Sequence, residues 1–185
     1  MSLRVISGTA RGRKLKSVPG DTTRPVMDRV KEALFNILAD DVIDSNWWDL
    51  FGGTGAIGIE ALSRGAIFVR FSDLNRAPVE TIKENVEHCG FIKQAEVRKG
   101  DAFSMLSAQS DRKFEYIYIA PPQYHEMWVK ALKLADENIS WLTDDGTVIV
   151  QIDPTEYQEI ELKNLGETEQ RKYGSTLIVF YDRVN

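Results

Sequence analysis

Short apolar runs alternate with helical stretches along most of the chain, and this alternation constrains the fold more than any other feature. Strand-like runs are centred on residues 47–51, 67–71, 95–97, 116–119 and 148–152. Apolar residues at helical spacing separate these runs, near residues 56–63, 77–89, 102–107 and 126–138. Strands that alternate with helices form a parallel sheet covered on both faces, so we expect an α/β fold.

The C-terminal part departs from this alternation. After Pro154, residues 159–172 are polar and irregular, and a strand-like run follows at residues 176–181. Two late strands with no helix between them predict a terminal antiparallel hairpin. A mostly parallel seven-stranded sheet that ends in such a hairpin is the layout of the Rossmann-like fold of class I methyltransferases.

A basic extension precedes this core. Strand-like runs at residues 3–7 and 13–18 flank a turn and predict a small β-hairpin, and a helical pattern follows at residues 26–39. No segment has the composition of a linker. We therefore expect one domain, residues 1–185, made of an N-terminal extension at residues 1–40 and a catalytic core at residues 46–185.

A glycine-rich segment, residues 49–58, lies between the first expected strand of the core and its helix. Gly53, Gly55 and Gly58 match the G-x-G-x-x-G pattern of dinucleotide-binding loops. Glycines allow a tight turn and let a ligand approach the backbone, and the helix that follows points free N–H groups at the ligand. The pattern alone does not separate a nicotinamide cofactor from S-adenosylmethionine.

Three carboxylates at successive strand ends favour S-adenosylmethionine. Asp49 suits a ligand that carries an ammonium or sulfonium group and is awkward beside a pyrophosphate. Asp73 is placed to accept from ribose hydroxyls, and Asp101 from the amine of adenine. The alternative for each is a helix or turn cap. The candidate cofactor residues are Asp49, Phe51, Gly52, Gly53, Thr54, Gly55, Asp73, Leu74, Asp101 and Ala102.

The basic side chains gather at the N-terminus. Residues 1–35 hold eight basic and three acidic side chains, a net charge of +5, whereas the whole chain has −5. A basic end on an acidic body fits docking onto a polyanion, and the alternative is a solvated arm with no partner.

Several segments resemble the RsmD family of bacterial and organellar 16S ribosomal RNA guanine-N2 methyltransferases. The resemblance covers almost the whole chain, and the N-terminal segments are more specific than the glycine loop. The matching segments are residues 4–8 (RVISG), 11–15 (RGRKL), 23–36 (TRPVMDRVKEALFN), 49–58 (DLFGGTGAIG), 60–65 (EALSRG) and, more loosely, 73–76 (DLNR).

The resemblance implies methyl transfer to an exocyclic guanine amine, whose lone pair is conjugated with the ring. In the family an Asp/Asn-Pro-Pro-Tyr/Phe motif accepts hydrogen bonds from the amine and stacks on the flipped-out base. The corresponding residues here are Ala120, Pro121, Pro122 and Gln123, followed by Tyr124. Ala120 has no side-chain acceptor, and Gln123 replaces the aromatic ring, which Tyr124 could supply from one residue along.

The resemblance makes the basic N-terminus an RNA-docking element. The candidate RNA-binding residues are Arg11, Arg13, Lys14, Lys16, Arg24 and Arg29. Such side chains neutralise phosphates and bind in a salt-dependent way. The partner implied is ribosomal RNA or the small-subunit particle.

Two other functions are weighed against an active RNA methyltransferase. One is a methyltransferase fold that binds RNA and S-adenosylmethionine with weakened chemistry because of Ala120. The other is a nicotinamide-dependent oxidoreductase, which the absence of a visible Tyr-Lys or His arrangement and of a substrate domain disfavours. We expect no metal, since no cluster has ligand spacing, and no membrane span, since no apolar run approaches about 20 residues. We also expect a cytoplasmic monomer.

Overall fold

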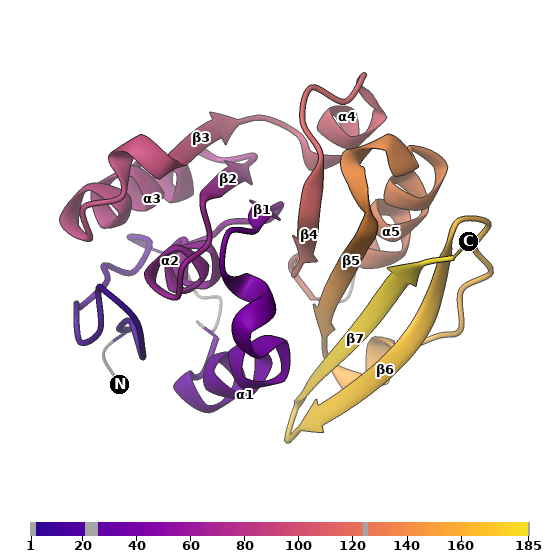
Figure 1. Ribbon diagram of the computed structural model, residues 1–185, viewed down its shortest axis with the longest axis horizontal. Coiled ribbons are helices and arrows are strands. Elements are labelled where there is room, and N and C mark those ends of the chain that lie inside the picture. The colour runs from indigo at the N-terminus through magenta and orange to yellow at the C-terminus, as the bar shows by residue number, and fades with distance from the viewer. Residues whose placement is uncertain (1–2, 21–25, 124–125, 185) are drawn as a thin grey trace. The chain divides into compact units, whose positions relative to one another are not determined.

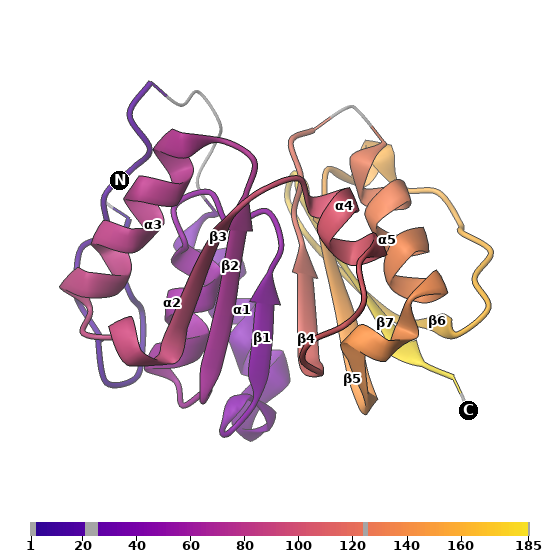
Figure 2. The same cartoon turned by 90° about the horizontal axis from the view of Figure 1, so that it is seen from above.

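The computed structural model describes residues 3–20, 26–123 and 126–184. The chain divides into two compact units, Met1–Gly100 and Asp101–Asn185. Their ribbons are drawn in Figures 1 and 2. In the part of the chain that the structure describes, no helix has the length and apolar character needed to cross a membrane.

The first unit is built on three parallel strands in the order β3-β2-β1. These strands are β1 (Asn46–Asp49), β2 (Phe68–Asp73) and β3 (Ala95–Lys99). Its α-helices are α1 (Asp28–Leu38), α2 (Ala56–Ser63) and α3 (Arg76–His88). Its described residues also form 3₁₀ turns at Ala39–Val42 and Ile92–Gln94.

Burial explains how these elements pack. On α3 the side chains of Val79, Ile82 and Val86 are buried at helical spacing, which is the pattern of a helix with one face on a sheet. Every residue of α2 is buried. The N-terminal segment, residues 3–20, packs against this helix in addition to β1 and β2. Figure 1 shows that segment alongside α2 and α3.

The expected N-terminal hairpin is present in reduced form. Arg4 and Lys14 form an isolated antiparallel bridge, and no strand of the described part precedes α1. Backbone bonds extend the pairing, with Val5 N–H donating to Arg13 O and Leu15 N–H to Leu3 O. The two arms are therefore paired, over too few residues to make regular strands.

The second unit holds four strands in the order β4-β5-β7-β6. β4 is parallel to β5, β7 is antiparallel to β5, and β6 is antiparallel to β7. The strands are β4 (Phe114–Ile119), β5 (Leu142–Ile152), β6 (Leu165–Tyr173) and β7 (Thr176–Arg183). The helices are α4 (Ala102–Ser107) and α5 (Met127–Glu137), with 3₁₀ turns at Ile139–Trp141 and Pro154–Glu156.

The expected α/β class, with seven mostly parallel strands and an antiparallel C-terminal hairpin, is confirmed. One detail of the prediction is wrong, because residues 165–173 form β6 where the sequence predicts polar, irregular chain. β6 ends the strand order and pairs with β7, so most of its side chains face solvent and carry no apolar pattern. A register shift between Glu167 and Glu169 obscures the alternation further.

Candidate functional site

The glycine loop, residues 50–55, joins β1 to α2 in the first unit. Gly53 and Gly55 have φ values of +57° and +82°, which side chains with a Cβ rarely adopt. Gly52 N–H donates to Ser72 O at 2.8 Å, so the loop folds back onto the end of β2. Gly55 N–H donates to Gly52 O at 2.8 Å and closes the turn just before the helix.

Asp73 ties the glycine loop to the end of β2. Its Oδ2 accepts from Gly53 N–H at 3.1 Å, and its Oδ1 accepts from Asn75 N–H at 3.1 Å. Each carboxylate oxygen has two lone pairs, so both oxygens keep acceptor capacity for a ligand hydroxyl. The neighbouring Leu74 is 59% exposed, which leaves an apolar surface beside this carboxylate.

Asp49 is buried at the end of β1, with 2% of its surface exposed. Its Oδ2 accepts from Gly58 N–H in the first turn of α2 at 3.2 Å. Burial raises the pKa of this carboxyl to about 8, the Gly58 hydrogen bond opposes the rise, and the charge of Asp73 adds to it. A positive group placed against Asp49 would lower that pKa, so this carboxylate favours a cationic ligand.

The structure therefore brings together the predicted cofactor residues of the first unit: Asp49, Phe51, Gly52, Gly53, Thr54, Gly55, Asp73 and Leu74. The capping alternative also applies to Asp49, because its carboxylate accepts from a helix N–H. The cap and the ligand role are compatible, since the second oxygen of the carboxylate is not used in that bond.

The remaining cofactor candidates, Asp101 and Ala102, begin the second unit. Asp101 caps α4, where its Oδ2 accepts from Ser104 N–H and Ser104 Oγ–H, both at 2.9 Å. The capping alternative thus holds for this residue. The adenine contact that the sequence predicts for Asp101 stays a prediction.

The predicted target-base segment follows β4 in the second unit. Ala120 and Pro121 are half-buried, whereas Pro122 and Gln123 are exposed. Tyr124 lies outside the described residues. The exposed Gln123 amide and the backbone carbonyls are thus the acceptors that this part of the segment offers.

Most of the candidate RNA-binding residues are exposed on the first unit. We call residues 11–16, which hold Arg11, Arg13, Lys14 and Lys16, the basic segment. Arg13 Nη1 donates to His88 O at 3.2 Å, and Lys16 Nζ pairs with the Glu84 carboxylate at 2.8 Å. Arg29 is exposed on α1, and Arg24 lies outside the described residues.

Two sets of buried polar side chains that anchor the N-terminus were not predicted from the sequence. The Lys31–Glu60 pair is fully buried, with Nζ and Oε2 3.4 Å apart, and Lys31 Nζ also donates to Arg4 O at 2.5 Å. The Glu60 carboxylate accepts from Ile6 N–H and Ser7 N–H. Burial lowers the pKa of Lys31, against the raising effect of Glu60.

The second group is Asn85, which is 1% exposed on α3. Its Oδ1 accepts from Lys16 N–H at 2.8 Å, and its Nδ2 donates to Lys16 O at 3.0 Å and to Thr54 O at 2.9 Å. A polar residue between Ile82 and Val86, on the apolar face of a helix, is the sequence signal that could have found it.

A family model described as "Conserved hypothetical protein 95" matches residues 3–182. The chain belongs to this family. The resemblance to the RsmD family is confirmed by two relatives. One is the putative rRNA methyltransferase YlbH of Bacillus subtilis, 36% identical over 98% of this chain and 99% of the relative. The other is the ribosomal RNA small subunit methyltransferase D of Haemophilus influenzae, 33% identical over 92% and 93%.

Solved structures agree with this family. A putative methyltransferase, yhhF, from Escherichia coli matches with a TM-score of 0.85 and 31% identity over 99% of this chain and 98% of that one. An RNA methyltransferase from Salinibacter ruber, solved with S-adenosylhomocysteine, matches with a TM-score of 0.66 and 15% identity over 86% and 94%. The second likeness concerns the fold alone. Together they confirm the expected methyltransferase fold.

Proposed function

We propose that this RsmD-family chain transfers a methyl group from S-adenosylmethionine to an exocyclic base amine, guanine N2 in particular, in small-subunit ribosomal RNA. The observation that carries the proposal is the buried Asp49 carboxylate beside the glycine loop, with Asp73 at the next strand end. The relatives named as ribosomal RNA methyltransferases support the same reaction.

The ligand chemistry fits the residues of the first unit. Asp49 would hold the ammonium of the amino-acid part, and Asp73 would accept from the ribose hydroxyls. The exposed Leu74 would pack against the adenine ring. Asp101, which begins the second unit, is the residue that the sequence assigns to the adenine amine. S-adenosylmethionine supplies, when bound, an electrophilic methyl group on a sulfonium.

The target amine would be oriented by the segment after β4. Backbone carbonyls of Ala120 and Pro121, together with the Gln123 amide oxygen, would accept from its N–H groups and turn its lone pair toward the methyl group. The N–C bond forms as the S–C bond breaks, the sulfur keeps the bonding electron pair, and the extra proton on nitrogen passes to water. Alignment of the reacting atoms supplies much of the rate, and it does not need an Asp at residue 120.

The test is transfer of labelled methyl from S-adenosylmethionine to protein-free small-subunit ribosomal RNA and, in parallel, to small-subunit particles. Digestion of the product to nucleosides identifies the methylated atom. We expect N2-methylguanosine. Label on another base or atom would show that guanine N2 is not the target, while the assignment as a methyltransferase would stand.

The second candidate is a binding protein with weakened chemistry, and the specific observation that favours it is Ala120 in place of the family's Asp or Asn. Loss of one charge-assisted hydrogen bond costs about 1.5–3 kcal/mol, or roughly ten- to a hundredfold in rate. Calorimetric binding of S-adenosylhomocysteine with no label transferred would favour this candidate. Binding of NADH with no binding of S-adenosylhomocysteine would instead support an oxidoreductase.

A further inference from the structure

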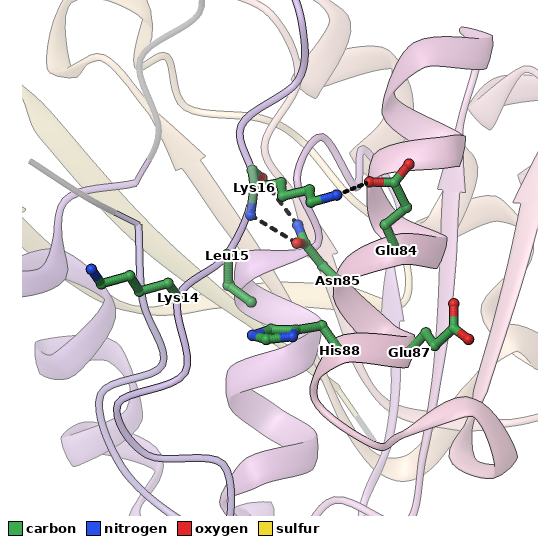
Figure 3. Close-up of a pocket in the computed structure, with 7 residues that line it drawn as sticks. All are labelled: Lys14, Leu15, Lys16, Glu84, Asn85, Glu87 and His88. Atoms are coloured by element: carbon green, nitrogen blue, oxygen red, sulfur yellow. Dashed lines mark hydrogen bonds and ion pairs between the residues drawn. The ribbon is translucent and has the colours of Figure 1, made fainter.

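Asn85 connects two segments of the first unit that the proposed function uses separately. Its side chain bonds both backbone groups of Lys16 in the basic segment and the carbonyl of Thr54 in the glycine loop. Figure 3 shows the Asn85 amide pointing at the backbone of Lys16, with both hydrogen bonds between the two residues drawn. One buried side chain therefore holds a part of the predicted RNA-docking surface and a part of the predicted cofactor loop.

The hydrogen-bonding capacity of this amide ties the two segments to one orientation. Both N–H groups of Asn85 Nδ2 are used, one on Lys16 O and one on Thr54 O, while Oδ1 accepts from Lys16 N–H. An amide has two N–H donors, so a shift that breaks one of these bonds leaves a buried polar group without its partner. To keep all three bonds, the Lys16 peptide would have to follow any movement of the Thr54 peptide.

The Lys16 side chain offers a place where RNA could change this arrangement. Its ammonium pairs with the Glu84 carboxylate at 2.8 Å, and the side chains of Lys16 and Glu84 are 72% and 54% exposed. Exposed pairs of this kind are weak, so an RNA phosphate can replace Glu84. The hollow beside the pair has a volume of about 490 Å³ and is lined by Lys14, Leu15, Lys16, Glu84, Asn85, Glu87 and His88.

We propose that Asn85 is a positioning residue that couples docking of RNA on the basic segment to binding of the cofactor in the glycine loop. This inference rests on the proposed function, because it takes the cofactor and RNA assignments from there. Coupling of two binding equilibria is reciprocal, so RNA should raise the affinity for the cofactor product by the factor with which that product raises the affinity for RNA.

The test compares the wild-type protein with Asn85→Leu, which keeps the branched side-chain shape and removes all three hydrogen bonds. The dissociation constant of S-adenosylhomocysteine is measured by calorimetry with and without saturating small-subunit ribosomal RNA. We expect RNA to tighten wild-type binding by about five- to tenfold, within the usual range of allosteric coupling. In Asn85→Leu the ratio should fall to about one. The matched control is Glu87→Gln, on the same helix and the same hollow, which should keep the wild-type ratio.

Failure of the inference can be told from failure of the proposed function. If wild-type protein binds S-adenosylhomocysteine and RNA but shows no coupling, or if Asn85→Leu keeps the coupling, the inference is wrong and the function stands. If wild-type protein does not bind S-adenosylhomocysteine, both are wrong.

A measurement on wild-type protein keeps the test decisive if the variant does not fold. Lys16 N–H donates to Asn85, whereas the adjacent Leu15 N–H donates to Leu3 O within the N-terminal segment. Saturation with S-adenosylhomocysteine should slow hydrogen exchange at the Lys16 amide more than at the Leu15 amide. Equal slowing at the two amides would overturn the role of Asn85.

Discussion

The carboxylate of Asp49 and the backbone amide of Gly58 are joined by a 3.2 Å hydrogen bond that spans the glycine loop. Asp49 ends β1, and Gly58 lies in the first turn of α2, so the bond holds the two ends of the loop in register. It compensates only part of the cost of burying a carboxylate, and the pKa of Asp49 rises to about 8. The same residue therefore shapes the loop and, in the proposed function, would hold the ammonium of the ligand.

The pH dependence of stability should report on this carboxyl. Its pKa is about 8 in the folded protein and 3.8 in a model peptide, so between these values the folded state binds the extra proton. The contribution of Asp49 to the free energy of unfolding therefore falls as pH rises from about 4 to about 8. The Asp49→Asn variant has an amide at this position, which does not titrate in this range. Urea unfolding across that range should show a slope that wild type has and Asp49→Asn lacks, and parallel curves would contradict the prediction.

The same substitution should weaken the cofactor site. Removal of the charge takes away a charge-assisted bond to the ligand ammonium, so the affinity for S-adenosylhomocysteine should fall by roughly ten- to a hundredfold. Calorimetry measures this loss, and the ratio of wild-type to Asp49→Asn affinity should grow with pH up to about 8. The ligand ammonium titrates in the same way in both measurements, so the ratio of the two affinities does not depend on it. An unchanged affinity would mean that Asp49 serves the loop alone.

Gly58 should be sensitive to a single added methyl group. A Cβ at this position would lie 2.3 Å from Phe71 Cε1 and 2.8 Å from Val69 Cγ1, both on β2. We expect Gly58→Ala to lower the free energy of unfolding by about 1–3 kcal/mol through overpacking between α2 and the sheet. Gly12→Ala separates crowding from backbone strain, because a Cβ there meets nothing within 4 Å while the φ of +83° costs an alanine about 1–2 kcal/mol. Denaturant unfolding that ranks Gly12→Ala as the more damaging change would count against this account.

The buried Lys31–Glu60 pair should stabilise the N-terminal segment. Replacement of Lys31 with Met leaves Arg64, 2.9 Å away, as the ion-pair partner of the buried Glu60 carboxylate. The cost should therefore lie below that of a fully broken buried pair, about 3–5 kcal/mol, and above that of an exposed pair. Arg4→Met tests an exposed pair in the same segment, because Arg4 and Asp28 are 59% and 28% exposed. We expect less than about 1 kcal/mol for that control. Thermal or denaturant unfolding distinguishes the two, and equal effects would contradict the prediction.

Local patterns allowed much of this structure to be predicted. The bounds of α2 and α4 match the expected residues 56–63 and 102–107, because Gly55 and Asp101 mark where each helix begins. Asp49 and Asp73 were predicted together with the glycine loop, since parallel strands end at one edge of a sheet. In these cases the decisive residues are neighbours along the chain or along consecutive strands.

The remainder depends on partners that are far apart along the chain. Asn85 bonds Lys16 and Thr54, which lie 69 and 31 residues away, and no local pattern relates them. Lys31 and Glu60 carry charges that a sequence places on the surface by default, yet both are buried. β6 was missed because it is an edge strand with solvated side chains, and such a strand lacks the apolar alternation that identifies strands.

The basic segment should dominate RNA affinity if it docks on phosphates. We expect Arg11→Glu/Arg13→Glu to weaken binding of small-subunit ribosomal RNA and to reduce the slope of log affinity against log salt by about 2, with cofactor affinity unchanged. Lys93→Glu/Lys133→Glu makes the same change in net charge at exposed residues outside that segment. Filter binding over a salt series measures both, and equal losses would indicate a general effect of net charge.

Ala120 decides between the two proposed functions. If guanine N2 is the target, a carboxylate at this position restores an acceptor for the amine, and Ala120→Asp should keep the methyl-transfer rate or raise it by up to roughly a hundredfold. Ala120→Asn restores a neutral acceptor and should have a smaller effect in the same direction, while Ala120→Val adds bulk without an acceptor and should not. Single-turnover transfer of labelled methyl measures the chemical step apart from product release. A gain from no detectable transfer would identify wild type as the weakened form, whereas a sharp loss on Ala120→Asp would mean that the segment after β4 serves a different base or atom.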